Sequence, residues 1–223
     1  KMWITNADVF DVGILFAKTN PKLKHKGITA FIIERGMPGL SSRSIKNKFG
    51  CRCSNTGELI FEDVRIPKSN IIGKVGEGFS VAMSALEYGR TSVAARILGL
   101  VQACLEASMK YANEREQFGQ KIGNFQMVQE QIADIATEVE ATRLLVYRSA
   151  WLQDQGQPST LESTMAKYFA TEVAIRASQS TMRIYGAYGN TDEYPVGRYY
   201  RDVILGATGE GTNNIQKIII VLG

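Results

Sequence analysis

The sequence holds few of the residues on which metal and nucleophile sites are built. Among its 223 residues there is one histidine, His25, with three cysteines and five prolines. A single histidine excludes any site that needs two, and it argues against metal hydrolases of the histidine-rich type. An odd and small number of cysteines argues against a disulfide scaffold and suits a reducing compartment.

Long hydrophobic runs and a strong net charge are also missing. The longest apolar run, Ile218 to Leu222, is far shorter than the ~20 residues that span a bilayer. The net charge is +4, from 26 basic and 22 acidic residues, which gives no electrostatic reason to expect a nucleic acid. We therefore expect a globular chain with no membrane or nucleic-acid partner, whose chemistry depends on carboxylates or a cofactor.

The pattern of the sequence changes after residue 73. Apolar runs at 12–17, 28–33 and 58–64, separated by turn-rich segments, predict antiparallel strands, and no helical pattern lies between them. Apolar residues at helical spacing then predict helices over 79–115, 125–152 and 161–184, with Ser159 or Thr160 as the N-cap of the third. A short helix from Tyr194-Pro195 to about residue 205 and a final one after residue 212 complete the chain. The fold class is α+β: an antiparallel β segment over 1–73, then an antiparallel helical bundle over 74–223.

Two loops carry the strongest signals for a site. In residues 208–212 the carboxylate of Glu210 stands between two glycines, where a backbone can approach a ligand closely. The alternative is a loop glutamate that caps the last helix. In residues 113–119, Arg115 and Phe118 put a cation and a ring at a helix end, which suits an anionic planar ligand. The alternative there is an ordinary helix C-terminus with Gly119 as the stop signal.

Other cofactor and metal motifs are missing. The glycine-rich turns at 73–78 and 206–211 match neither G-x-G-x-x-G after a strand nor G-x-x-x-x-G-K-[ST]. Cys51-x-Cys53 has no second pair of ligands, so we expect no metal site.

Eight short motifs follow one another in order. They are K-M-W-I-T-N at 1–6, G-I-T-A-F-I at 27–32, S-N-T-G-E-L-I-F-E-D-V-R-I-P at 54–67, G-E-G-F at 76–79, R-E-Q-F-G-Q-K-I at 115–122, F-Q at 125–126, Y-P at 194–195 with R-D at 201–202, and E-G-T-N-N-I-Q at 210–216. Together they resemble the FAD-dependent acyl-CoA dehydrogenase family, in its C-terminal half: part of the β-domain plus the C-terminal helical domain.

The resemblance implies a reaction. Members of the family oxidise an acyl-CoA thioester to the 2,3-enoyl-CoA, and FAD binds between the β-domain and the helical bundle. Glu210 would take the α-proton while the β-hydride goes to flavin N5, and the electrons would pass to electron-transferring flavoprotein. An acyl-CoA oxidase and a non-catalytic scaffold of the same family are the alternatives.

The resemblance also implies roles for particular residues. Those carried over for the cofactor are Trp3 and Thr5 at the flavin ring, Arg115, Gln117, Phe118 and Gln126 at the FAD of a neighbouring subunit, Arg183 and Gly186 in an altered glycine turn, and Thr212 and Asn214 beyond the glutamate. Those carried over for the substrate are Glu87, Arg90 and Gly211. A homotetramer built as a dimer of dimers is implied, in a bacterial cytoplasm or the mitochondrial matrix.

Two glycines refine this expectation. Some members of the family place the base immediately before the arginine of the first long helix, where this chain has Gly89, so Glu210 is left as the one base. Gly209 stands where many members carry a tyrosine, which predicts an enlarged or reshaped acyl pocket, suited to a branched, cyclic or dicarboxylic acyl group.

Overall fold

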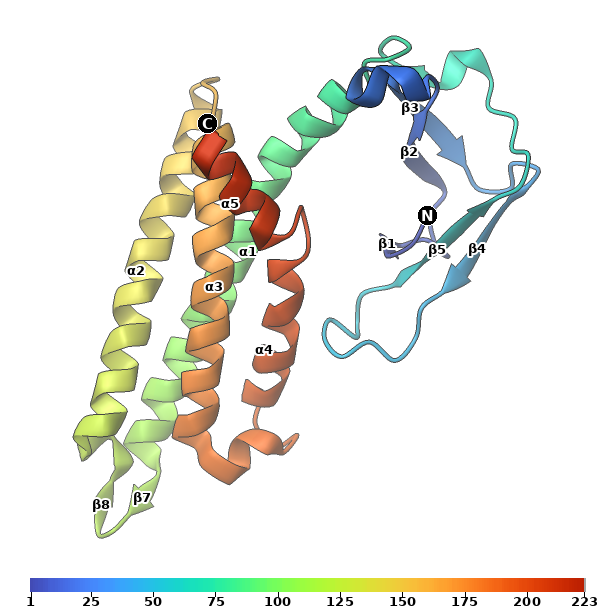
Figure 1. Ribbon diagram of the computed structural model, residues 1–223. Coiled ribbons are helices and arrows are strands. Elements are labelled where there is room, and N and C mark those ends of the chain that lie inside the picture. The colour runs from blue at the N-terminus through green and yellow to red at the C-terminus, as the bar shows by residue number, and fades with distance from the viewer. Residues whose placement is uncertain (223) are drawn as a thin grey trace. The chain divides into compact units, whose positions relative to one another are not determined.

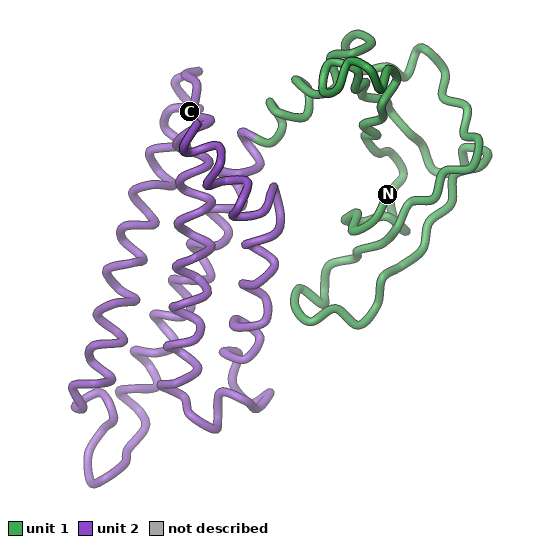
Figure 2. Tube along the Cα trace, viewed as in Figure 1, with its two compact units in different colours: residues 1–86 green, residues 87–223 purple. Residues whose placement is uncertain are grey.

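The computed structural model describes residues 1–222 of the chain and divides it into two compact units, Lys1–Leu86 and Glu87–Gly223 (Figure 2). The division falls within the long helix α1, Gly78–Glu114. A domain boundary after residue 73, as the sequence predicts, stays a prediction.

The first unit is antiparallel β-structure. Its strands are β1 (Ile4–Thr5), β2 (Val12–Lys18), β3 (Ile28–Glu34), β4 (Leu40–Ser44), β5 (Thr56–Phe61) and β6 (Ile71–Ile72). They form two three-stranded sheets in the orders β1-β5-β4 and β2-β3-β6. Ala7, Leu15, Ile33 and Leu59 are buried between them. The strands predicted at 12–17 and 28–33 are confirmed, whereas the third begins at Thr56 and ends at Phe61, before the acidic pair that follows.

The second unit is a helical bundle. After α1 come β7 (Glu116–Gln117), β8 (Gln120–Lys121), α2 (Gln126–Asp154), α3 (Thr160–Tyr185), α4 (Val196–Val203) and α5 (Asn213–Leu222), with short 3-10 turns at Ile122–Asn124, Gly186–Asn190 and Ile204–Ala207. Helix α3 contacts α2, α4 and α5, and the β7–β8 hairpin projects from the end of the bundle opposite α5 (Figure 1). The predicted helices are therefore confirmed to within two residues at most ends.

Small residues in the core of the bundle let its helices pack closely. Helix α3 presents Ala166, Ala170, Ala174 and Ala177 at helical spacing, and these small side chains let its neighbours approach. Val101 of α1 and Val139 of α2 are buried in the same cluster. Helix α1 is the one described helix long and apolar enough to cross a membrane by length and composition. After Glu87, the apolar face of α1 packs in this core. Core helices of globular proteins can have the same length and composition.

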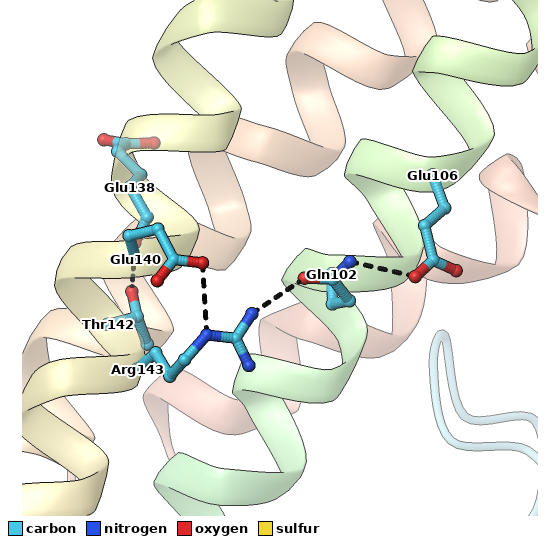
Figure 3. Close-up of polar contacts among 6 residues, drawn as sticks. All are labelled: Gln102, Glu106, Glu138, Glu140, Thr142 and Arg143. Carbon is cyan, nitrogen blue, oxygen red and sulfur yellow. Dashed lines mark hydrogen bonds and ion pairs between the residues drawn. The ribbon is translucent and has the colours of Figure 1, made fainter.

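Polar contacts link α1, α2 and α3 at the surface. Arg143 of α2 donates to Glu140 Oε1 at 3.2 Å and to Gln102 Oε1 of α1 at 3.0 Å (Figure 3). Gln102 in turn donates to Glu106 at 2.9 Å, and Arg176 of α3 donates to Glu138 of α2 at 2.9 Å. Because these groups are partly exposed, each contributes little to stability, and they serve mainly to fix the helix register.

Candidate functional site

The glutamate turn, residues 206–212, connects the end of α4 and its 3-10 extension to α5. Glu210 has φ 53° and Gly211 has φ 88°, so two successive residues lie in the left-handed region. A non-glycine residue there is uncommon and costs conformational energy. The Glu210 side chain is exposed, and Thr212, not Glu210, caps α5, because its hydroxyl accepts from the N–H of Ile215 at 3.4 Å. This removes the main reason to regard Glu210 as a helix cap.

The carboxylate of Glu210 lies directly against Gly89 of α1. A Cβ at residue 89 would lie 3.0 Å from Glu210 Oε2 and 3.3 Å from its Cδ. Contacts this short require a shift of a few tenths of an ångström, so a side chain at residue 89 would push the Glu210 carboxylate away from this position. The two alternative base positions suggested by the sequence therefore meet at one place in the fold.

Arg90 lies beside them but faces inward. Its side chain is 4% exposed, its Nη1 donates to Thr164 Oγ1 at 3.4 Å, and among the described residues its Nε has no hydrogen-bond partner. Burial lowers the pKa of Arg90, and the carboxylates of Glu210 and Glu87 oppose that shift. A buried cation thus lies close to the Glu210 carboxylate. A role of Arg90 toward coenzyme A stays a prediction.

Glu87 makes a structural contact that the sequence does not predict. Its Oε1 accepts from the backbone N–H of Ser159 at 2.6 Å and from the Ser159 hydroxyl at 2.8 Å. Ser159 is the N-cap residue of α3, as expected, but its hydroxyl makes no cap hydrogen bond, since it is directed to Glu87 instead. Glu87 therefore ties the α2–α3 connection to α1.

The residue that the sequence analysis missed is Lys167 of α3. It is fully buried beneath the glutamate turn, where its ammonium group donates to backbone carbonyls of the turn and to Asn213. The residues three and four positions away, Ser163, Thr164, Ala170 and Thr171, are all small and all buried. Small residues beside a lysine do not distinguish a buried helix face from an exposed one, so the local pattern did not identify Lys167.

A second group of predicted residues, the hairpin cluster, lies at the other end of the bundle. It consists of Arg115, Gln117, Phe118, Gln126, Arg183 and Gly186. The β7–β8 hairpin turns at Phe118 (φ 53°) and Gly119 (φ 79°), the two positive φ angles of a type I′ turn. The Phe118 side chain is 92% exposed, and Gln117, Gln126, Arg183 and Gly186 are exposed as well. This segment was expected at the end of a helix, and α1 does end at Glu114, whereas the hairpin that follows was not predicted. Gly119, the stop signal of the alternative interpretation, lies in the hairpin turn.

Arg115 lies beside a group of packed tyrosine rings. The rings of Tyr111 and Tyr185 stack with centroids 4.0 Å apart, and the guanidinium carbon of Arg115 lies 5.3 Å from the centre of the Tyr188 ring. Tyr185 donates its hydroxyl to Ala107 O at 3.1 Å, and burial raises the pKa of Tyr185 to about 12. The end of α1 is thereby packed against the end of α3, and the Arg115 cation is held against an aromatic face.

The two clusters lie far apart along one helix. Gly89 and Glu114 both belong to α1, which rises about 1.5 Å per residue, so roughly 40 Å separates the glutamate turn from the hairpin cluster. The remaining predicted residues are Thr212 and Asn214, exposed at the start of α5, and Trp3 and Thr5, exposed in the first unit. Trp3 has φ 64° and is 66% exposed, while Ile4 beside it packs in the core of that unit.

An antiparallel β unit, followed by a helical bundle with an exposed carboxylate in the turn before its last helix, is the two-part arrangement that the motifs predicted. Comparison with protein families makes this specific: residues 1–64 match the acyl-CoA dehydrogenase middle domain and residues 76–222 match the acyl-CoA dehydrogenase C-terminal domain. The chain belongs to the acyl-CoA dehydrogenase family.

Curated relatives support the assignment over the whole chain. A glutaryl-CoA dehydrogenase of Desulfococcus multivorans is 46% identical over 100% of this chain and 57% of its own length. A mitochondrial short/branched chain specific acyl-CoA dehydrogenase of Rattus norvegicus is 41% identical over 97% of this chain and 50% of its own. The chain thus spans about half the length of the curated relatives it matches.

Solved structures share the fold. A chain of the structure "Electron transferring flavoprotein of Acidaminococcus fermentans: Towards a mechanism of flavin-based electron bifurcation" superposes with a TM-score of 0.96 at 44% identity, over 99% of this chain and 58% of that one. "PigA with FAD and proline" gives a TM-score of 0.96 at 34% identity, with the same two coverages. The α+β fold expected from the sequence is confirmed.

Proposed function

We propose that the protein containing this chain is an FAD-dependent acyl-CoA dehydrogenase in which Glu210 removes the α-proton of the substrate thioester. The observation that carries the proposal is the exposed Glu210 carboxylate, held at Gly89 in a left-handed turn between two helices. Family membership supports the reaction class, and the relatives named as glutaryl-CoA and short/branched chain enzymes support a thioester substrate.

The donor set fits FAD. Arg115 and Arg183 supply cations for a pyrophosphate, Gln117 and Gln126 supply amides, and the exposed Phe118 ring supplies a face for a planar base. At Gly186 nothing lies within 4 Å of the place where a Cβ would stand, so a ligand can approach the backbone there. The relative described with bound FAD supports the same choice.

The chain's own contribution is a positioned base. The α-proton of a thioester is weakly acidic, so a base and stabilisation of the developing enolate oxygen must act together. Glu210 accepts the proton, and a backbone N–H at the glutamate turn donates to the thioester oxygen. FAD, when bound, supplies the acceptor for the β-hydride. Gly89 leaves the space that the carboxylate needs.

The separation of the two clusters supports an oligomer. One FAD molecule is shorter than the roughly 40 Å between the glutamate turn and the hairpin cluster, so both cannot serve the same cofactor. We assign the hairpin cluster to the FAD of a neighbouring subunit, and the assembly to a homotetramer built as a dimer of dimers. We assign the cellular location to a bacterial cytoplasm or a mitochondrial matrix, since the curated relatives include bacterial and mitochondrial enzymes.

The acyl group is expected to be branched, cyclic or dicarboxylic. A Cβ at Gly209 would meet only the Leu205 carbonyl oxygen, at an ordinary 3.5 Å, so the glycine is not required by close packing. Its missing side chain therefore leaves room beside Glu210. A relative named for glutaryl-CoA, a dicarboxylic thioester, agrees with this expectation.

The electron acceptor distinguishes a dehydrogenase from an oxidase. We assign the electrons to electron-transferring flavoprotein, consistent with the Acidaminococcus fermentans relative. The test is anaerobic mixing of the full-length flavoprotein with a panel of acyl-CoA thioesters, followed by admission of either electron-transferring flavoprotein or oxygen. Bleaching of the flavin band with reoxidation by the flavoprotein is expected. Rapid peroxide release would indicate the oxidase, and a protein without flavin would indicate the scaffold.

A further inference from the structure

Lys167 is the largest fully buried side chain of the chain's described residues. It lies in α3, in the layer beneath the glutamate turn, and burying an ammonium group is costly unless it is fully hydrogen-bonded. Part of this cost is offset here by three acceptors for its three N–H donors. They are Gly211 O at 2.8 Å, Asn213 Oδ1 at 2.8 Å and Ala207 O at 3.4 Å.

All three acceptors belong to the segment that carries Glu210. Ala207 precedes the glutamate by three residues, Gly211 follows it directly, and Asn213 begins α5. Asn213 is itself held, since its Oδ1 accepts from Thr171 at 3.1 Å and its Nδ2 donates to Glu172 at 2.7 Å. One ammonium group thus joins α3 to both sides of the turn.

The turn needs such support because its backbone is strained. Glu210 is a non-glycine residue at φ 53°, a conformation that persists only when its surroundings hold it. Its own carbonyl accepts from the buried Gln216 amide at 3.1 Å, and the next carbonyl accepts from both Gln216, at 3.1 Å, and Lys167. Two buried donors therefore fix the peptide groups on which the direction of the Glu210 side chain depends.

We propose that Lys167 is a positioning residue for the reaction: its ammonium group holds the glutamate turn in the left-handed conformation that places the Glu210 carboxylate against Gly89. It touches neither substrate nor cofactor. The proposal rests on the role proposed for Glu210, and it deepens that role by naming the group that orients the base.

The charge of Lys167 is needed for this contact. A neutral amine has two donors for three acceptors, so one carbonyl of the turn would lose its hydrogen bond. Burial, and to a smaller extent Arg90 of α1, lower the pKa of Lys167 to about 8 against the opposing effect of the Glu210 and Glu172 carboxylates. The contact is therefore complete below about pH 8 and is lost as the pH rises through that value.

The first experiment compares Lys167→Met with Lys110→Met in the full-length flavoprotein. Methionine fills the same space without a donor, and Lys110 is an exposed lysine on α1 that serves as the matched control. We expect amide exchange of residues 205–214, measured at pH 7 by mass spectrometry, to be about 10-fold faster or more in Lys167→Met only. Flavin reduction by a good acyl-CoA should slow about 10-fold to 100-fold, with a smaller change in substrate affinity. Unchanged exchange together with unchanged reduction would overturn the proposal.

The second experiment separates positioning from general stabilisation and does not depend on the methionine variant folding. The rate of flavin reduction in the unsubstituted protein is expected to fall above about pH 8, and Glu172→Gln should move this fall to lower pH. Glutamine still accepts from Asn213 but removes a carboxylate that favours the charged lysine. If the fall of the flavin-reduction rate at high pH occurs at the same pH in Glu172→Gln, the proposal is contradicted. If no acyl-CoA reduces the flavin, the proposed function fails, whereas the exchange measurement still decides whether Lys167 holds the turn.

Discussion

The two ends of the helical bundle present their candidate residues in opposite ways. At the glutamate turn one exposed carboxylate stands on buried donors, Lys167 and Gln216, that hold the backbone from beneath. In the hairpin cluster the predicted residues other than the half-buried Arg115 are themselves exposed, with Phe118 at 92%. The role proposed for Glu210 requires a carboxylate held in one position, whereas the role proposed for the hairpin cluster requires side chains that a neighbouring subunit can reach. This contrast predicts that substitutions at the first end change rates, and that substitutions at the second change cofactor retention.

The largest effect is expected for Glu210→Gln. The amide keeps the shape of the carboxylate beside Gly89 but cannot take up the α-proton. General-base catalysis contributes about 10²–10⁴-fold, and the described bundle offers no second carboxylate at this position, so the loss should lie near the top of that range. Stopped-flow bleaching of the oxidised flavin band measures it, with FAD content and acyl-CoA binding as controls. Undiminished bleaching would remove Glu210 from the mechanism.

Placing a carboxylate at residue 89 instead of residue 210 should recover part of the rate of flavin reduction. Because a Cβ at residue 89 would lie 3.0 Å from Glu210 Oε2, Gly89→Glu alone should displace the native carboxylate from its position. In Gly89→Glu with Glu210→Gly the space is free, and the new carboxylate starts from the facing helix. We expect flavin reduction at least about 10-fold faster than in Glu210→Gly, below the unsubstituted rate because small misplacements are costly. Equal rates in the double and single variants would show that the two positions do not share one task.

Because of Lys167, the free energy of unfolding should rise with pH while the rate of flavin reduction falls. Its pKa falls from the usual 10.5 to about 8, so between these values the unfolded chain binds a proton that the folded protein does not. The free energy of unfolding then rises with pH over this window relative to Lys167→Met, by up to roughly 3 kcal/mol. Flavin reduction falls over the same window. Thermal unfolding midpoints of both proteins at pH 7.5 and 9.5 test the first trend, and a constant difference between the proteins would contradict it.

At the hairpin end, Arg115→Ala should lower FAD occupancy more than helix content. A lost charge-assisted hydrogen bond is worth about 1.5–3 kcal/mol, or about 10-fold or more in affinity. Arg148→Ala is the matched control, since Arg148 is an exposed arginine paired with Glu162 on the bundle surface. Occupancy is read from the ratio of flavin to protein absorbance, and assembly from light scattering. A monomer with full flavin content would contradict a shared site.

The contrast also explains what the sequence could predict. Strong helical periodicity located α1, α2 and α3 to within two residues. Motif resemblance singled out Glu210 and Arg115, whose roles stay predictions. Strand β4, with the sequence Leu-Ser-Ser-Arg-Ser, was missed because it is a polar edge strand whose pairing with β5 depends on tertiary contacts. The contacts of Lys167 and Glu87 were missed for the same reason. Each joins segments more than forty residues apart, and local pattern carries no record of such pairings.

The smallest effect on stability is expected for substitution of Phe118. Stability and FAD retention should change in opposite directions. It occupies the first position of a type I′ turn at φ 53°, where asparagine is favoured and a bulky ring is not, and its side chain finds little packing within this chain. Phe118→Asn should therefore leave stability unchanged or raise it by a few tenths of a kcal/mol, seen as a slightly higher midpoint of thermal unfolding for the flavin-free protein. FAD retention should fall nonetheless, since the ring that we assign to the cofactor of a neighbouring subunit is gone. A variant that keeps its flavin would show that the exposed ring serves no cofactor, and one that loses stability would show that Phe118 packs within its own subunit.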